Sequence, residues 1–151
     1  MPTTATACVV EPFSTANAAL NSSSDPAVLA AQFHSMLVQE LSKRGVTPKE
    51  SHPLLGRPTY AVEGSFVQID DGDRALRYFL SFLAGAAFLE VKGWLFQGDM
   101  PVIELHARAS QSIGVFGGDS KRMLLTCAAA AGKQIALQVD EAIANRVQVT
   151  T

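Results

Sequence analysis

Charge, cysteine and long apolar runs are all scarce in this chain of 151 residues. Charged residues are 17% of the total, 12 Lys and Arg stand against 14 Asp and Glu, and no basic run occurs. Nucleic-acid binding normally needs a basic face that displaces counterions from phosphates, so the composition argues against nucleic acid as a partner. Hydrophobic residues make up 48%, which is typical of a globular protein rather than a disordered one.

The chain length is compatible with one domain of ordinary size. We expect a single domain over residues 1–151, with an ordered core at about 8–146. A chain of roughly 150 residues buries enough surface to fold without a metal or a disulfide. Cys8 and Cys127 are the two cysteines, and small apolar thiols also pack well in cores. Their number therefore leaves the redox compartment open.

No segment of the sequence is apolar over the length of a membrane-spanning helix. The uncharged run Tyr78–Leu89 has 12 residues, whereas a transmembrane helix needs about 20. We expect this run to belong to the core, with contact to a membrane surface as the alternative. Residues 1–7 lack the basic head and apolar centre of an export signal, although Ala5–Cys8 resembles a lipoprotein cleavage box. The sequence is therefore compatible with a cytoplasmic location, and also with an envelope location reached through an export signal upstream of this chain.

Two segments have the periodicity of amphipathic helices. Asp25 and Pro26 are typical of a helix start, and Gly45 is typical of a helix end, which predicts a helix over residues 26–44. The second helix is predicted over residues 120–146. The apolar faces of the two helices are predicted to contain Leu29, Phe33, Met36, Leu37 and Leu41, and Leu124, Ala128, Ala131, Ile135, Val139 and Ala142.

Four segments have strand character, and residues 14–24 and 46–58 read as connections between elements. In one strand, Tyr60, Val62 and Phe66 alternate onto one face, which leaves Val67 and Ile69 on the other. Gly64 in the same strand indicates a bulge or a close backbone contact. The four predicted strands are residues 7–13, 60–69, 86–96 and 102–110.

These elements follow one another in the order β-α-β-β-β-α. We therefore expect an α+β fold with a two-layer sandwich architecture, in which two helices cover one face of about four mostly antiparallel strands. The last three strands are expected to form a meander.

A glycine-rich loop precedes the second predicted helix, and it contains the residues Gly114, Gly117, Gly118, Asp119 and Ser120. Backbone amides at a helix start can bind anions, and glycines would let a phosphate approach. However, Asp119 occupies the position where a P-loop has lysine, and a carboxylate there repels phosphate. We expect Asp119 or Ser120 to cap the helix, with an anion or partner site as the alternative.

Other groups of polar residues do not form a recognisable site. The segment 70–73 contains three aspartates but lacks the alternating ligands and terminal glutamate of a calcium-binding loop. His34, His52 and His106 are scattered, and none has a second ligand at the spacing of a metal site. The sequence predicts no catalytic residue, no metal site and no cofactor.

Five motifs built from glycine and packing residues follow one another along the chain: Val9–Phe13, Ser23–Ala27, Val62–Val67, Gly72–Phe79 with Ala84–Ala86, and Gly114–Gly118. In this order they resemble a bacterial family, domain of unknown function 4410, over residues 8 to about 145. The resemblance implies an exported lipoprotein of the cell envelope, with a fold similar to small periplasmic domains of the curli-secretion-channel type. It implies no catalytic residue. The chain departs from the family at Ser81 and Leu83, where the family is richer in glycine.

The leading functional hypothesis is a non-catalytic envelope or periplasmic module that acts through contacts with a protein partner or with itself. The alternative is a small-molecule or anion-binding protein, or an enzyme, that uses the loop Gly114–Ser120. A third hypothesis is a peripheral membrane protein that uses Tyr78–Leu89.

Overall fold

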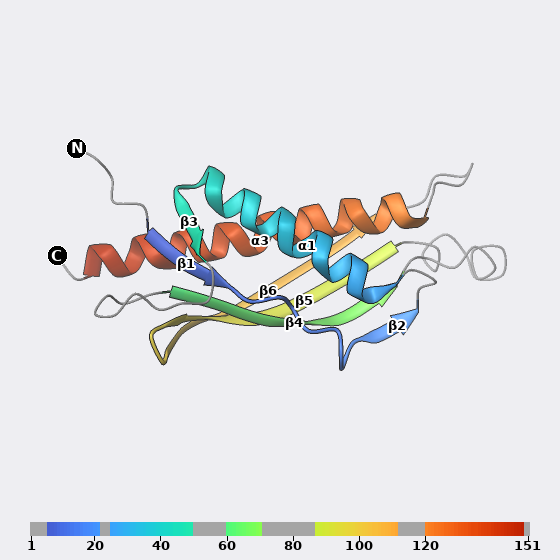
Figure 1. The fold of residues 1–151 in the computed structure, drawn as a ribbon, viewed down its shortest axis with the longest axis horizontal. Helices are drawn as coiled ribbons and strands as arrows, with labels where there is room; N and C mark the ends of the chain where they lie inside the picture. Colours follow the sequence, from blue (N-terminus) through green and yellow to red (C-terminus); the bar gives the residue numbers. More distant parts are fainter. Residues whose placement is uncertain (1–5, 22–24, 50–59, 71–86, 112–119, 150–151) are drawn as a thin grey trace.

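The computed structural model describes residues 6–21, 25–49, 60–70, 87–111 and 120–149 (Figure 1). These residues form six strands and two helices. In chain order they are β1 (Thr6–Val10), β2 (Ala19–Asn21), α1 (Pro26–Lys43), β3 (Val46–Lys49), β4 (Tyr60–Asp70), β5 (Ala87–Gln97), β6 (Met100–Gln111) and α3 (Ser120–Val149).

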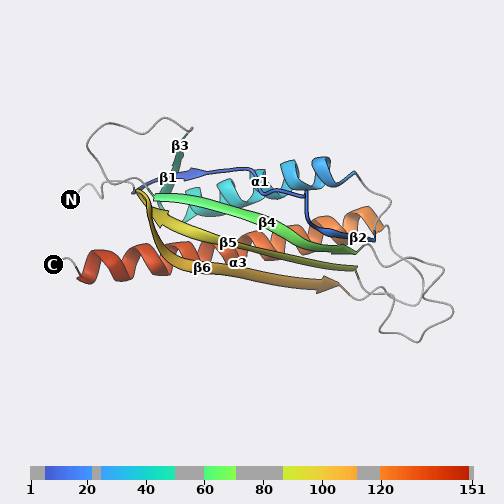
Figure 2. The ribbon, with the colours of Figure 1, turned by 90° about the horizontal axis from the view of Figure 1, so that it is seen from below.

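The helices and strands form two layers, as the sequence predicts. Figures 1 and 2 show α1 and α3 side by side on one face of the sheet, while the opposite face carries no helix of the described residues. The three long strands β4, β5 and β6 pair antiparallel as a meander. The predicted α+β fold and the order β-α-β-β-β-α of its principal elements are therefore confirmed.

The sheet has six strands instead of about four, in the order β3-β1-β4-β5-β6, with β2 also paired to β4. The two additional strands, β2 and β3, lie within segments predicted as connections. Both are short and pair parallel to a neighbour, β2 with β4 and β3 with β1. Such strands are fixed by backbone pairing with a distant segment, so they leave little alternation in their own sequence.

The first strand continues along β4 as an interrupted strand. The N–H of Glu11 donates to the carbonyl of Val62, and the N–H of Ser14 donates to the carbonyl of Gly64. The N–H of Phe66 donates in turn to the carbonyl of Ser14 at 2.8 Å. Residues 6–21 thus run beside β4 for most of its length, with Pro12 at the interruption.

A bulge in β4 changes the face of its last residues. The register with β5 shifts between Phe66 and Gln68, so that Val67 is the extra residue. One extra residue reverses the alternation that follows it. Ile69 is therefore buried in the core with Tyr60 and the other inward residues, and its predicted placement on the opposite face is wrong.

The helix ends follow the residues that predict them. Asp25 precedes α1, and its Oδ1 accepts a hydrogen bond from the N–H of Ala27 at 2.9 Å. After the helix, Gly45 has a φ of 82°, in the left-handed region that glycine adopts readily. The helix observed over Pro26–Lys43 confirms the prediction to within one residue.

The core lies between the helices and the sheet. Three phenylalanines meet edge to face there, and the ring centre of Phe33 lies 5.0 Å from that of Phe13 and 5.3 Å from that of Phe66. They join α1, the interruption after β1, and β4. The other large, fully buried side chains are Leu37, Leu41, Val62, Ile69, Leu89, Val91, Leu95, Leu105, Leu124 and Ile135.

Candidate functional site

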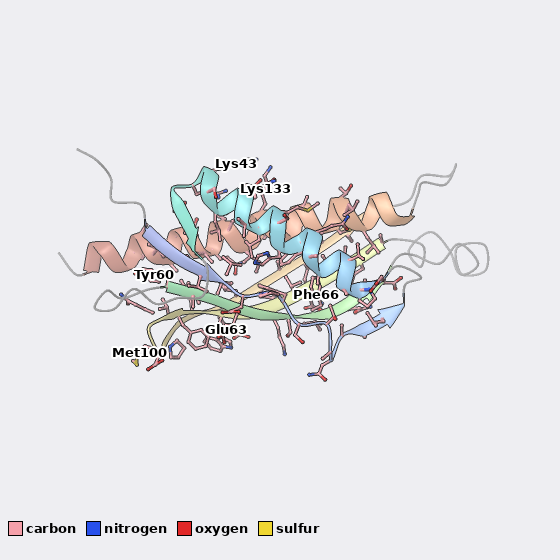
Figure 3. All side chains as sticks on the ribbon, viewed as in Figure 1. Lys43, Tyr60, Glu63, Phe66, Met100 and Lys133 are labelled. Carbon is pink, nitrogen blue, oxygen red and sulfur yellow. The ribbon has the colours of Figure 1, made fainter. Side chains whose placement is uncertain are left out.

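The face of the sheet away from the helices is the candidate site. Along β5, Leu89, Val91 and Leu95 are buried under the helices, so the residues between them point to the open face. Figure 3 shows the two directions on β4, where Phe66 points toward the helices and Glu63 points away from them. Three adjacent strands, β4, β5 and β6, thus present their alternate side chains on this open face.

One end of this open face is apolar with an acidic rim. Trp94 is 44% exposed, and it lies directly opposite Glu63 on β4 and Glu104 on β6, both exposed. In the next row, Phe96 lies opposite Pro101. Met100 is 68% exposed and lies at the tip of the β5–β6 hairpin. We call these residues of the open face, together with Met100 at the adjoining hairpin tip, the Trp94 surface: Glu63, Trp94, Phe96, Met100, Pro101 and Glu104.

The middle of the open face is a network of charges. The Nε2 of His106 donates to the Oε2 of Glu90 at 2.5 Å, and the Nε of Arg108 forms an ion pair with the same oxygen at 3.3 Å. The guanidinium of Arg108 also lies 5.9 Å from the ring centre of Phe88. Because Arg108 is largely exposed and His106 is half-exposed, these ion pairs orient side chains more than they stabilise the fold.

The three histidines have separate positions. The Nε2 of His34 donates to the carbonyl of Val10 at 2.9 Å and so ties α1 to β1. His106 belongs to the charge network on the opposite face of the sheet, and His52 lies outside the described residues. Within the described ranges no three residues of the His, Cys, Asp and Glu types gather as metal ligands.

The other predicted candidates lie largely outside the described ranges. Residues 112–119 are not described, so the predicted anion or partner loop with Gly114, Gly117, Gly118 and Asp119 stays untested; Ser120 is the first residue of α3. Asp70 ends β4, and residues 71–73 are also outside. Of the apolar run Tyr78–Leu89, the described part begins β5 with Ala87 and Leu89 buried.

Both cysteines are free and buried. Burial raises the pKa of the Cys8 thiol to about 12 and that of the Cys127 thiol to about 11. The Cys127 thiol lies 3.8 Å from the carbonyl oxygen of Ala87. Thiols that are neutral at physiological pH are poor nucleophiles and poor metal ligands, so both cysteines serve packing.

Sequence reasoning missed the Trp94 surface. The signal was present, because the outward residues Glu90, Lys92 and Trp94 alternate with inward apolar residues along β5. A tryptophan that shares one face of a strand with a glutamate and a lysine is expected to be exposed. What the sequence alone does not provide is the register that places Glu63 and Glu104 on either side of it.

The fold and the site together define an α+β protein with an exposed aromatic on the sheet face that its two described helices leave open. A family model described as a domain of unknown function (DUF4410) matches residues 7–145, and the chain belongs to this family. The resemblance noted in the sequence is thereby confirmed. No curated protein matches the chain. In the described part of the chain, no helix combines the length and the apolar character needed to cross a membrane.

Three solved structures are similar in fold. Protein XCC0632 from Xanthomonas campestris has a TM-score of 0.59 at 12% identity, with 97% of this chain and 88% of that chain covered. An uncharacterized protein has a TM-score of 0.58 at 15% identity, with 94% of each chain covered. The hypothetical protein CT253 from Chlamydia trachomatis has a TM-score of 0.54 at 13% identity, with 94% of this chain and 95% of that chain covered. At these identities the likeness concerns the fold alone.

Proposed function

We propose that this chain is a non-catalytic module of the cell envelope that binds a protein partner through the Trp94 surface. One observation carries the proposal: a large aromatic side chain stands exposed between two carboxylates on a sheet face that neither of the described helices covers. The core of the domain lies on the other face of the sheet, so the packing of the domain does not require an aromatic residue at position 94.

The composition of the Trp94 surface fits a protein contact. Tryptophan and methionine are enriched in interfaces, and tryptophan contributes strongly to binding when it enters a pocket of the partner. Covering Trp94 and Met100 removes apolar area from water, which favours association. These two side chains are therefore the expected anchors.

The charges around Trp94 determine the chemistry of the partner. Glu63 and Glu104 are exposed, and within the described residues neither forms an ion pair. A lysine or arginine of a partner would lie between the two carboxylates and over the indole, which attracts cations. The favoured partner is thus a protein segment with alternating basic and apolar side chains.

The envelope location and the absence of catalysis rest on the sequence. The family resemblance implies export, and the sequence contains no recognisable set of catalytic residues. Fractionation of the native host tests the location: the proposal expects the protein with the membrane or periplasmic fractions. Recovery of the protein with the cytosolic marker alone would refute the location and leave the contact surface to be tested separately.

The contact surface has a direct probe, because Trp94 is the one tryptophan of the chain. We would titrate the protein with an eight-residue peptide of alternating Arg and Leu and follow tryptophan fluorescence, with an alternating Glu and Leu peptide as the comparison. The proposal predicts a saturable change with the basic peptide alone, which weakens as salt is added because the carboxylates attract the peptide electrostatically.

Two variants complete the titration. Glu63→Gln/Glu104→Gln keeps the indole and removes both charges, so the affinity for the basic peptide should fall about tenfold or more. Glu141→Gln removes an exposed carboxylate from α3 and should leave the affinity unchanged. Equal binding of the basic and acidic peptides, or equal loss in the two variants, would contradict the proposed partner chemistry.

A further inference from the structure

Strand β6 forms one edge of the sheet, and two glutamines of α3 bind its outer backbone groups. The Oε1 of Gln138 accepts from the N–H of His106 at 3.0 Å, and the Nε2 of Gln138 donates to the carbonyl of the same residue at 2.6 Å. Gln134 repeats this pattern at Arg108, at 3.3 Å for the N–H and 2.8 Å for the carbonyl. Two side-chain amides thus satisfy four backbone groups of an edge strand.

The spacing of the glutamines matches the spacing of the strand. Residues four apart on a helix are separated by about 6 Å along its axis, and residues two apart on a strand are separated by about 6.6 Å. Gln134 and Gln138 therefore reach Arg108 and His106 with helix and strand running in opposite directions. A primary amide carries the same donor and acceptor as a peptide group, so the two side chains stand where the peptide groups of an added strand would pair.

We propose that Gln134 and Gln138 act as a surrogate strand that closes a latent strand-addition site on β6, and that the occupant of the opened site is β6 of a second copy. An edge strand with free N–H and C=O groups is a template for another strand, and proteins cover such edges to prevent association. The proposal rests on other observations than the Trp94 surface, which lies on the face of the sheet and not on its edge, although Glu104 belongs to both.

The charges of β6 favour a second copy as the occupant. Glu104, His106 and Arg108 share the alternation that turns their backbone groups to the edge. When two β6 strands pair antiparallel about His106, Glu104 of each copy lies opposite Arg108 of the other. Opposite charges at directly facing positions stabilise such a pair, so this register is complementary to itself and needs no other protein.

The test is the double variant Gln134→Ala/Gln138→Ala, with Lys133→Ala/Leu137→Ala as the matched control. The control removes two exposed residues from the same turns of α3. Amide exchange measured by NMR at micromolar concentration reports whether the edge of β6 is still protected. Light scattering across a concentration series reports the mass of the protein in solution and so its oligomeric state. We expect the amides of His106 and Arg108 to exchange at least tenfold faster in the glutamine variant, and the control to behave as the wild type.

With rising concentration, the glutamine variant should pass from 16.0 kDa to twice that mass, with the amides of β6 protected again. Adding Glu104→Lys places a cation opposite Arg108 of the second copy and should return the variant to the monomer. A glutamine variant that stays monomeric at millimolar concentration overturns the proposal, and so does a dimer that Glu104→Lys leaves intact. If the double variant fails to fold, Gln134→Ala and Gln138→Ala are measured singly, because each single variant keeps the two hydrogen bonds of the other glutamine.

Discussion

Two glycines face each other across β4 and β5, and they allow the strands to approach. A Cβ added to Gly93 would lie 2.2 Å from the carbonyl oxygen of Glu63 and 2.8 Å from the Cα of Gly64. Both neighbours are backbone atoms, which cannot move without disturbing the pairing of the strands. We predict that Gly93→Ala lowers the free energy of unfolding by about 3 kcal/mol, measured by urea denaturation.

A third glycine provides the control. In α3, a Cβ on Gly132 would lie 3.6 Å from the nearest atom, the backbone nitrogen of Leu37, which is ordinary van der Waals contact. Because alanine is the better helix former, Gly132→Ala should be neutral or stabilising by up to about 1 kcal/mol. Equal effects of the two substitutions would argue against the close approach of β4 and β5.

The two thiols give a prediction on pH. Burial raises the pKa of Cys8 to about 12 and that of Cys127 to about 11, from 9.0 for an exposed thiol. The folded state therefore favours the neutral thiols: their contribution to stability is complete below pH 9 and declines as the pH rises toward the folded values. We predict a steeper alkaline loss of stability in the wild type than in Cys8→Ala/Cys127→Ala.

Thiol labelling checks the same point at constant pH. At pH 8 both thiols should resist a water-soluble disulfide reagent in the native protein and react fully in denaturant, because the thiolate is the reactive form. Rapid labelling of either cysteine in the native protein would show that it is less buried than the structure indicates.

The segment that precedes α3 gives a prediction based on its sequence and on the observed start of the helix. Because α3 begins at Ser120, Asp119 precedes it in the position of a capping residue. Asp119→Ala should lower the free energy of unfolding by about 0.5–2 kcal/mol, and millimolar phosphate should leave the melting temperature of the wild type unchanged. A rise in melting temperature with phosphate that Asp119→Ala or a change at Gly117 abolishes would favour the anion-binding alternative.

At the scale of the elements, Phe33 joins three parts of the fold. Its ring meets Phe13, which follows β1, and Phe66 on β4, while Phe33 itself belongs to α1. We predict that Phe33→Ala costs about 3–5 kcal/mol, because it removes a fully buried ring and leaves a cavity between layers. The matched control Val28→Ala removes a half-exposed side chain from the same helix and should cost less than about 1 kcal/mol.

The helices and long strands could be predicted because their signals are local. Asp25, Pro26 and Gly45 fix the ends of α1 through backbone hydrogen bonding and backbone conformation within a few residues. The alternation in β5 and β6 reports burial on one side only, which is a property of each strand by itself.

The strands β2 and β3 and the bulge at Val67 could not be predicted, because each depends on a distant segment. The three residues of β2 pair with Gln68, Ile69 and Asp70, far along the chain. The bulge exists only relative to β5, and it moves Ile69 into the core. The same dependence on register hides the site, since Glu63 and Glu104 are 41 residues apart and meet only through Trp94.

At the scale of the whole molecule, the two faces of the sheet differ in what they contact. One face packs against α1 and α3 and holds the core (Figure 2). In the described part of the chain no helix lies on the other face, which has an ion-pair network at its centre and the Trp94 surface at the hairpin end. We expect binding to concentrate at that end, because it combines exposed apolar area with carboxylates that have no ion pair among the described residues.

Site-specific photocrosslinking in living cells tests this claim most directly. A photoreactive residue is introduced at Met100, at the tip of the hairpin that carries Trp94, and in a parallel strain at Lys133, which Figure 3 shows on the outer side of the helices. Mass spectrometry then identifies the crosslinked segment. The account predicts a defined protein adduct at position 100, joined through a basic and apolar segment, that Trp94→Ser or Glu63→Gln/Glu104→Gln abolishes, and no adduct at position 133. An adduct at position 133 alone, or one at position 100 that survives these substitutions, would contradict it.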